Sequence, residues 1–228
     1  MKTIAAVYRF CLLLLLTAFP VFVHAQGTLN EDATMIVTPS AAVAELQTSW
    51  ALAQYESDEK HQAKSFETLL EKANSLISNA PKETDLYVWR GIIKASYAGV
   101  KGGLGALGLV KEAKTDLETA INLGGGSLQA AARTSLGSLY FQVPPWPIAF
   151  GNDKKAEAYL LEGLAMAPDD IDSNYFYALF LLDQRQGEKA RQYLERAYTA
   201  PRRLGRAYAD QERQREVLEL ITEQQKQK

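Results

Sequence analysis

The sequence predicts an all-α protein, a solenoid of about four helical hairpins that ends in a C-terminal capping helix. A pattern of small or apolar residues spaced by four and then three positions occurs four times, beginning at Leu69, Ala113, Ala156 and Ala190. This spacing places three side chains on one face of a helix. Each copy is followed four or five residues later by proline or glycine, which end helices. The copies begin 44, 43 and 34 residues apart, a period typical of stacked helical hairpins.

The first two hairpins are predicted from helical spacing and from turn residues. Apolar residues with helical spacing indicate helices over residues 39–56 and 59–78. In the second hairpin Asp85 can cap the first helix, and the second helix runs over about 109–123. Five glycines within residues 99–108 predict a loop between these two helices.

The third hairpin begins near Ser127 and contains a proline-rich loop. Gly137 on its first helix lets the second helix approach closely. Three prolines in residues 143–152 exclude a continuous helix there, and residues 154–167 form the second helix.

The fourth hairpin has the most regular pattern. Asp170 or Asp172 can cap its first helix, and a turn at Gln186-Gly187 leads into a second helix over residues 188–199. A short basic linker follows, and then a polar helix from about Ala207 that suits a solvated cap over the last hairpin.

Residues 1–25 have the features of a cleavable export signal. Lys2 and Arg9 accompany an apolar stretch at 10–19, and Val23-His24-Ala25 fits the preference of signal peptidase for small residues. We expect cleavage after Ala25 and a periplasmic protein without a membrane span. The alternative is an uncleaved anchor helix, for which the apolar stretch is short.

Cys11 is the only cysteine, and it precedes the leucine run rather than following it, so lipid attachment is not expected. We expect three segments after the leader: a flexible N-terminus over 26–38, a helical-repeat domain over 39–204 and a capping helix over 205–228.

Composition excludes several functional classes. The formal net charge is −2, with both signs mixed along the chain, so no large basic face for nucleic acid is implied. Without cysteine after the leader, disulfides, a cysteine nucleophile and cysteine-ligated metal are excluded. His61 is the only histidine outside the leader, and no Gly-x-Ser-x-Gly motif accompanies it. We therefore expect no enzyme activity, no metal site and no cofactor.

The hairpins resemble tetratricopeptide repeats over about residues 45–200. Ala178 and Ala190 are twelve residues apart, the separation that this family has between the small residues of its two helices. The two middle repeats have longer separations, which predicts inserted loops of about ten and seven residues. The residues that fit the first-helix signature are Gly91, Leu136, Gly137, Tyr140, Tyr177, Ala178 and Leu181.

The inserts at residues 101–113 and 136–151 are similar to those of the T component found with tripartite ATP-independent periplasmic (TRAP) transporters. In that family a helical-repeat protein associates with a periplasmic solute-binding protein. The resemblance implies a periplasmic location and a protein partner, such as a solute-binding protein. It also implies an alternative function as a ligand-carrying accessory of a TRAP-type transporter, with an apolar small molecule as its ligand.

The repeat resemblance also implies which residues face a binding groove, because the first helix of each hairpin lines the concave side. For Trp146 and Phe150 in the proline-rich loop two interpretations stay open: they pack between hairpins, or they line a partner or ligand site. The implied groove positions are Asp85, Val88, Ile92, Thr134, Ser138, Phe141, Gln142, Tyr175, Leu179 and Leu182.

Three further patterns have structural interpretations. The glycines of 103–108 match the dinucleotide-binding fingerprint, but a helix precedes them where a strand is needed, so we expect a tight loop. The acids of 169–174 lack the glycine and glutamate of a calcium loop, and we interpret them as a helix cap. We interpret Arg202, Arg203 and Arg206 as solvated side chains or caps of helix carbonyls, with an acidic partner as the alternative. The expected function is a non-catalytic scaffold that binds a protein or peptide through its concave surface and inserted loops.

Overall fold

The computed structural model describes residues 39–226, and this part of the chain is helical. It contains nine helices, and its only β-type pairing is an isolated bridge between Pro145 and Gly151. The all-α prediction is therefore confirmed for these residues. The predicted export signal at 1–25, with Cys11, and the predicted flexible segment up to residue 38 lie outside the described residues.

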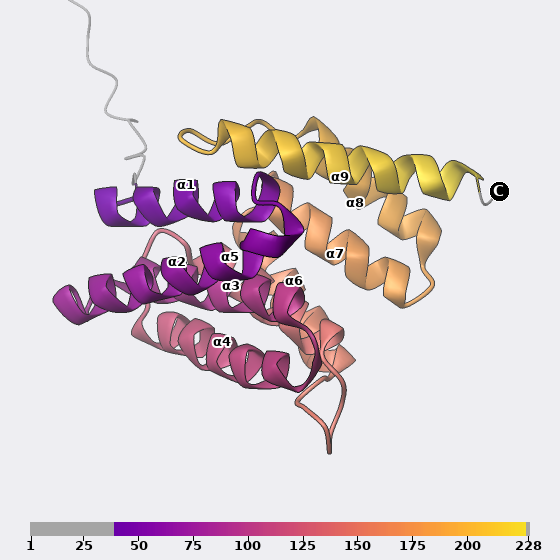
Figure 1. Cartoon of the computed structure of the whole chain (residues 1–228). Coiled ribbons are helices and arrows are strands. Elements are labelled where there is room, and N and C mark those ends of the chain that lie inside the picture. The colour runs from indigo at the N-terminus through magenta and orange to yellow at the C-terminus, as the bar shows by residue number, and fades with distance from the viewer. Residues whose placement is uncertain (1–38, 227–228) are drawn as a thin grey trace, which may run out of the picture. The chain divides into compact units, whose positions relative to one another are not determined.

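The helices follow one another with short connections (Figure 1). Four of them begin at a capping side chain: Ser40, Asp58, Asn152 and Asp170 each accept a hydrogen bond from a backbone N–H of the first turn. The cap predicted at Asp170 is confirmed. The bounds are α1 Ala41–Tyr55, α2 Glu59–Asn79, α3 Thr84–Lys101, α4 Gly103–Leu123, α5 Gln129–Gln142, α6 Asp153–Met166, α7 Ile171–Asp183, α8 Gly187–Thr199 and α9 Ala207–Lys226.

Consecutive helices pack side by side in pairs, α3 with α4, α5 with α6, and α7 with α8. The recurring pattern forms the inner face of the second helix in each pair: Leu117, Leu160 and Leu194 are fully buried. Glycines face two of these leucines. A Cβ on Gly91 would lie 2.8 Å from Leu117 Cγ, and one on Gly137 would lie 2.7 Å from Leu160 Cγ. The close approach predicted at Gly137 is confirmed.

The glycine-rich loop predicted within residues 99–108 is wrong. Helix α3 continues to Lys101 and α4 begins at Gly103, so Gly102 alone joins them, with φ of 61°. The extra residues of this hairpin lengthen both helices instead of forming a loop. Leu104 therefore lies in the first turn of α4, where its side chain is 87% exposed. The fingerprint-like glycines also lie in α4 and follow a helix.

Three clusters of buried side chains form the core. One spans α3 to α8, a second joins α1, α2 and α3, and a third joins α7, α8 and α9 around Val217. Ala209 of α9 belongs to the second cluster, so α9 also packs against α1 (Figure 1). The sequence predicted that α9 covers only the last hairpin, so the contact between α9 and α1 was not expected. None of the helices in residues 39–226 is long and apolar enough to cross a bilayer.

Candidate functional site

The predicted groove positions lie on α3, α5 and α7, and the exposed ones are nearest the C-terminal end of each helix. Gln142 is exposed. Four positions are partly exposed: Ile92, Phe141, Leu179 and Leu182. The others are no more than 9% exposed and pack inside the molecule: Asp85, Val88, Thr134, Ser138 and Tyr175. The binding role of these positions stays a prediction, and the surface that they can offer lies in the middle of α3 and in the C-terminal halves of α5 and α7.

Asp85 fixes the turn that precedes α5. Its carboxylate accepts hydrogen bonds from the backbone N–H and the hydroxyl of Ser127, at 3.0 and 2.6 Å, and from the N–H of Leu128 at 3.1 Å. Gly126 passes so close that a Cβ there would lie 2.2 Å from the carboxylate. The predicted cap of its own helix is wrong, since the N-cap of α3 is Glu83.

Replacing Asp85 with alanine is expected to lower the free energy of unfolding by about 2 kcal/mol, because two backbone N–H groups of the turn lose a charged acceptor. Urea denaturation of the variant and of an exposed-site control, Asp183→Ala, measures the effect. Unchanged stability in Asp85→Ala together with weaker partner binding would instead assign Asp85 to a binding surface.

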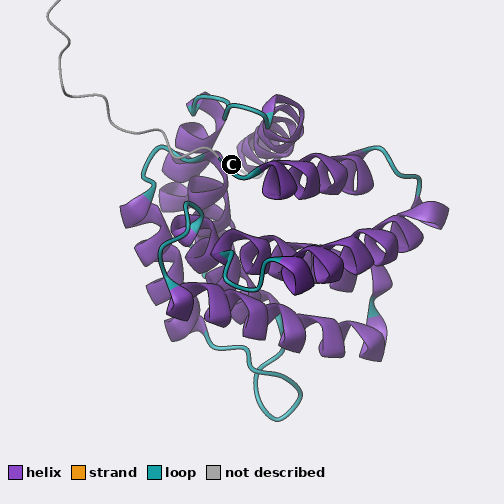
Figure 2. Ribbon diagram, turned by 90° about the vertical axis from the view of Figure 1, so that its left-hand side faces the viewer, coloured by secondary structure: helices purple, strands orange, loops and turns teal. Residues whose placement is uncertain are grey.

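The loop between α5 and α6 is held by its own backbone. Gly151 N–H donates to Pro144 O at 3.0 Å, and Asn152 N–H donates to Tyr140 O at 2.8 Å. Phe150 packs edge-on against Tyr140, with 5.4 Å between ring centroids. Trp146 is 85% exposed in this loop, and the loop projects from the helices in Figures 1 and 2. The two interpretations therefore have different outcomes for the two residues. Phe150 packs against α5 and α4, whereas Trp146 does not pack between hairpins.

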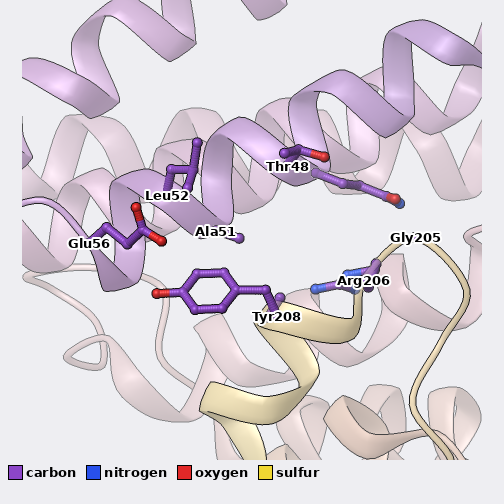
Figure 3. Close-up of a pocket in the computed structure, with 9 residues that line it drawn as sticks. Thr48, Ala51, Leu52, Glu56, Gly205, Arg206 and Tyr208 are labelled. Atoms are coloured by element: carbon purple, nitrogen blue, oxygen red, sulfur yellow. The ribbon is translucent and has the colours of Figure 1, made fainter. Parts of the chain in front are cut away.

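A pocket of about 210 Å³ lies between α1 and the start of α9 (Figure 3). Ala51 of α1 faces Tyr208 across it. Its volume of about 210 Å³ is below the roughly 300 Å³ at which sites for drug-sized ligands begin, so only a smaller molecule fits it. No sequence pattern indicated this pocket, because its walls come from segments about 150 residues apart. The lining residues are Gln47, Thr48, Ala51, Leu52, Glu56, Gly205, Arg206, Tyr208 and Ala209.

A network of charged side chains joins α7 to the linker before α9. Arg203 Nη1 lies 2.9 Å from Asp170 and its Nη2 lies 2.8 Å from Asp172. Arg203 also pairs with the fully buried Asp210. From α9, Arg213 Nε lies 3.1 Å from Asp172, and its guanidinium stacks 4.4 Å from the Tyr175 ring centroid.

The interpretation of the linker arginines as solvated is wrong for two of the three. Arg203 and Arg206 are largely enclosed, and Arg206 Nη1 lies 3.6 Å from Asp172. Arg202 is exposed and donates to the Gln214 side chain at 3.0 Å. The reason is the return of α9 across α7, which brings acidic side chains against the linker.

Neighbouring charges and burial shift the pKa values of the acidic side chains in this network. Burial alone would raise the pKa of Asp172, but the guanidiniums of Arg203, Arg213 and Arg206 outweigh it and hold this pKa well below its ordinary value. Glu216, beside Arg213, shows the opposite balance, because burial raises its pKa more than the arginine lowers it. The ion pairs of this network join α7, the linker and α9. Each of its three aspartates, Asp170, Asp172 and Asp210, pairs with at least one arginine.

The described residues contain no group of three or more His, Cys, Asp or Glu side chains that could hold a metal ion. His61 lies on the surface, as predicted, with its Nδ1 2.8 Å from the Asp58 carboxylate. No family model matches the chain, and no curated protein matches it.

Proposed function

We propose that this protein is a non-catalytic periplasmic scaffold of the tetratricopeptide-repeat type that binds a protein or peptide partner. The observation that carries the proposal is a set of partly exposed apolar side chains on three neighbouring helices: Ile92 in the middle of α3, Phe141 near the end of α5, and Leu179 and Leu182 in the last turns of α7. These helices are neighbours, since α5 packs against both α3 and α7. Phe141 of α5 lies edge-on to Phe180 of α7 at 5.8 Å between centroids.

This surface suits recognition of an extended peptide or a partner's loop. Phe141, Leu179 and Leu182 each keep part of their surface exposed while packing against a core cluster, so their positions are fixed before binding. Pre-positioned aromatic and aliphatic side chains are the usual energetic centres of interfaces. Gln142, which donates to the Ser138 hydroxyl at 2.9 Å, adds a polar group at the edge.

Site-specific photo-crosslinking tests the proposal. A photoreactive phenylalanine analogue replaces Gln142 in one variant, and in a control variant it replaces Glu157, which is exposed on the second helix of the same hairpin. We expect a discrete adduct in cells from position 142, lost when Leu182→Ser is added, and none from position 157. Equal adducts from both positions, or no adduct from position 142, would contradict the proposal.

Export is a separate part of the proposal and has its own test. N-terminal sequencing of the protein purified from a periplasmic fraction should begin at Gln26. A chain that retains residues 1–25 and sediments with membranes would support the anchor-helix alternative instead.

A second candidate function is a ligand-carrying accessory of a TRAP-type transporter. The pocket between α1 and α9 favours it, because Ala51, Leu52 and Ala209 supply an apolar wall. Native mass spectrometry of the purified protein should then show an added apolar mass, lost when Ala51→Trp fills the pocket. A spectrum without any added mass would remove the support for this candidate.

A further inference from the structure

Three large apolar side chains are exposed on two neighbouring connections. Leu104 is 87% exposed at the start of α4, and Trp146 and Ile148 are 85% and 60% exposed in the loop before α6. We call the end of the molecule that carries these two connections the loop end. Both connections lie on the same side of the helices in Figure 1. Phe150 of the loop also contacts α4, where the Lys114 ammonium lies 5.8 Å from its ring centroid.

The exposed side chains are presented by rigid backbone. Besides the bonds described above, the loop has Ile148 N–H donating to Pro145 O at 3.1 Å, and a Cβ on Gly151 would lie 2.2 Å from Val143 O. The two ends of the loop are therefore held against each other by their own backbone. Trp146 belongs to none of the three core clusters, whereas Phe150 packs against the largest one. An indole held in water without a partner is unfavourable, so this geometry indicates an external apolar contact.

The segments that carry these apolar side chains are rich in lysine. Segments 99–111 and 143–155 together contain four lysines and one acidic residue, Asp153, although the whole chain has a net charge of −2. Among the described residues, no ion pair involves any of the four lysines, and all four are exposed: Lys101, Lys111, Lys154 and Lys155. Two of them are oriented by rings, with Lys101 Nζ 5.2 Å from Tyr97 and Lys155 Nζ 5.4 Å from Tyr140.

We propose that the loop end binds the surface of an anionic lipid bilayer. Trp146, Ile148 and Leu104 enter the interfacial region, and the lysines contact the headgroups. Tryptophan prefers this region because its ring is apolar while its N–H stays hydrated. Each lysine close to an anionic surface adds attraction that salt weakens. The protein then lies on the membrane without crossing it, which agrees with the finding on its helices.

The shape of the loop end favours a bilayer over a protein. Trp146 and Ile148 protrude on the loop before α6 and Leu104 on the first turn of α4, and the pocket described above lies elsewhere, between α1 and α9. A stable protein interface requires about 800 Å² of matched surface on each partner. A fluid lipid surface accepts separate protruding side chains without such matching. The side chains that carry this inference, Trp146, Ile148 and Leu104, are not part of the proposed partner surface, although Phe141 and Gln142 directly precede the loop.

Co-sedimentation with vesicles tests the proposal. The form of the protein used in this experiment starts at Gln26. It keeps every described helix and lacks the apolar run at 10–19, which would itself bind lipid. We expect binding to phosphatidylcholine vesicles that contain phosphatidylglycerol, and at least about tenfold weaker partitioning for Trp146→Ser. Leu204→Ser is the matched control, because Leu204 is 89% exposed but lies between α8 and α9. The double variant Lys154→Gln/Lys155→Gln should bind the anionic vesicles more weakly, and its binding should depend less on salt concentration.

Tryptophan fluorescence gives a second readout. The chain has three tryptophans, and Trp50 and Trp89 are only 5% and 2% exposed. A blue shift on adding anionic vesicles, with quenching by lipids brominated in the acyl chains, would place Trp146 in the interface. Circular dichroism confirms that each variant is folded. The proposal is overturned if Trp146→Ser binds vesicles as well as the parent, or if the parent binds none. In the second case, a crosslink from position 146 to a protein would assign the loop end to that protein.

Discussion

Replacing Asp172 with asparagine is expected to lower the free energy of unfolding by about 3 kcal/mol. The carboxylate of Asp172 accepts hydrogen bonds from Arg203 and Arg213 and lies close to Arg206. Removing one member of an enclosed ion network leaves the others with uncompensated charge, which typically costs about 3–5 kcal/mol. We use the lower end of that range because the side chain of Asp172 is 21% exposed and its amide replacement retains one acceptor oxygen.

Urea denaturation at neutral pH measures the change, and Asp169→Asn is its control. Asp169 lies three residues earlier in the same turn and is exposed, and none of the described ion pairs includes it. A loss for Asp172→Asn no larger than that for Asp169→Asn would mean that the network does not stabilise the fold.

The pH dependence of stability gives a second measurement of the same network. Because the folded-state pKa of Asp172 is lowered, its contribution is fully present above the unfolded-state pKa of about 3.9 and is lost as pH falls through the folded-state value. The stability difference between parent and Asp172→Asn should therefore narrow as the pH is lowered below about 4. The raised pKa of Glu216 has the opposite sign: its contribution is present at low pH and is lost as pH rises.

The sequence predicted the helices well where local signals are strong. The recurring small and apolar residues place Leu160 and Leu194 in the core, and Asp170 caps α7 as expected. It failed where glycine was taken as a helix stop. Gly105 and Gly108 lie inside α4 although a glycine typically costs a helix about 1 kcal/mol, and only Gly102 and Gly103, both with positive φ, make the turn from α3.

The candidate surfaces depended on contacts that no local pattern encodes. The return of α9 to α1 and α7 encloses Arg203 and Tyr175, and nothing near either residue in the sequence indicates that contact. A repeat resemblance identifies which helix faces inward, but it cannot show which turns are covered by a later helix. By contrast, the proline-rich segment around Trp146 was identified as a loop from its sequence, since three prolines exclude a helix whatever packs around them.

Replacing Gly137 with alanine is the second change with a large expected effect, a loss of about 3 kcal/mol in the free energy of unfolding. The new Cβ would lie 2.7 Å from Leu160 Cγ, 2.9 Å from the Leu160 backbone nitrogen and 3.0 Å from Ala156 O. Two of these atoms are backbone, so a side-chain rotation cannot relieve the contact and α6 must move away from α5. Overpacking of this kind typically costs about 1–3 kcal/mol, and the backbone contacts place this case at the upper end.

A matched control separates steric overlap from helix propensity. Gly108→Ala changes the same residue type inside α4, where a Cβ meets no atom within 4 Å, so it should raise stability by about 0.5–1 kcal/mol. Thermal unfolding of both variants should give shifts of opposite sign. Adding Leu160→Ala to Gly137→Ala removes the contact with Cγ but not those with the backbone, and it opens a cavity. The double variant should therefore be less stable than Gly137→Ala alone. Recovery to the parent's stability would show that the Leu160 side chain, rather than the backbone of α6, sets the distance between the two helices.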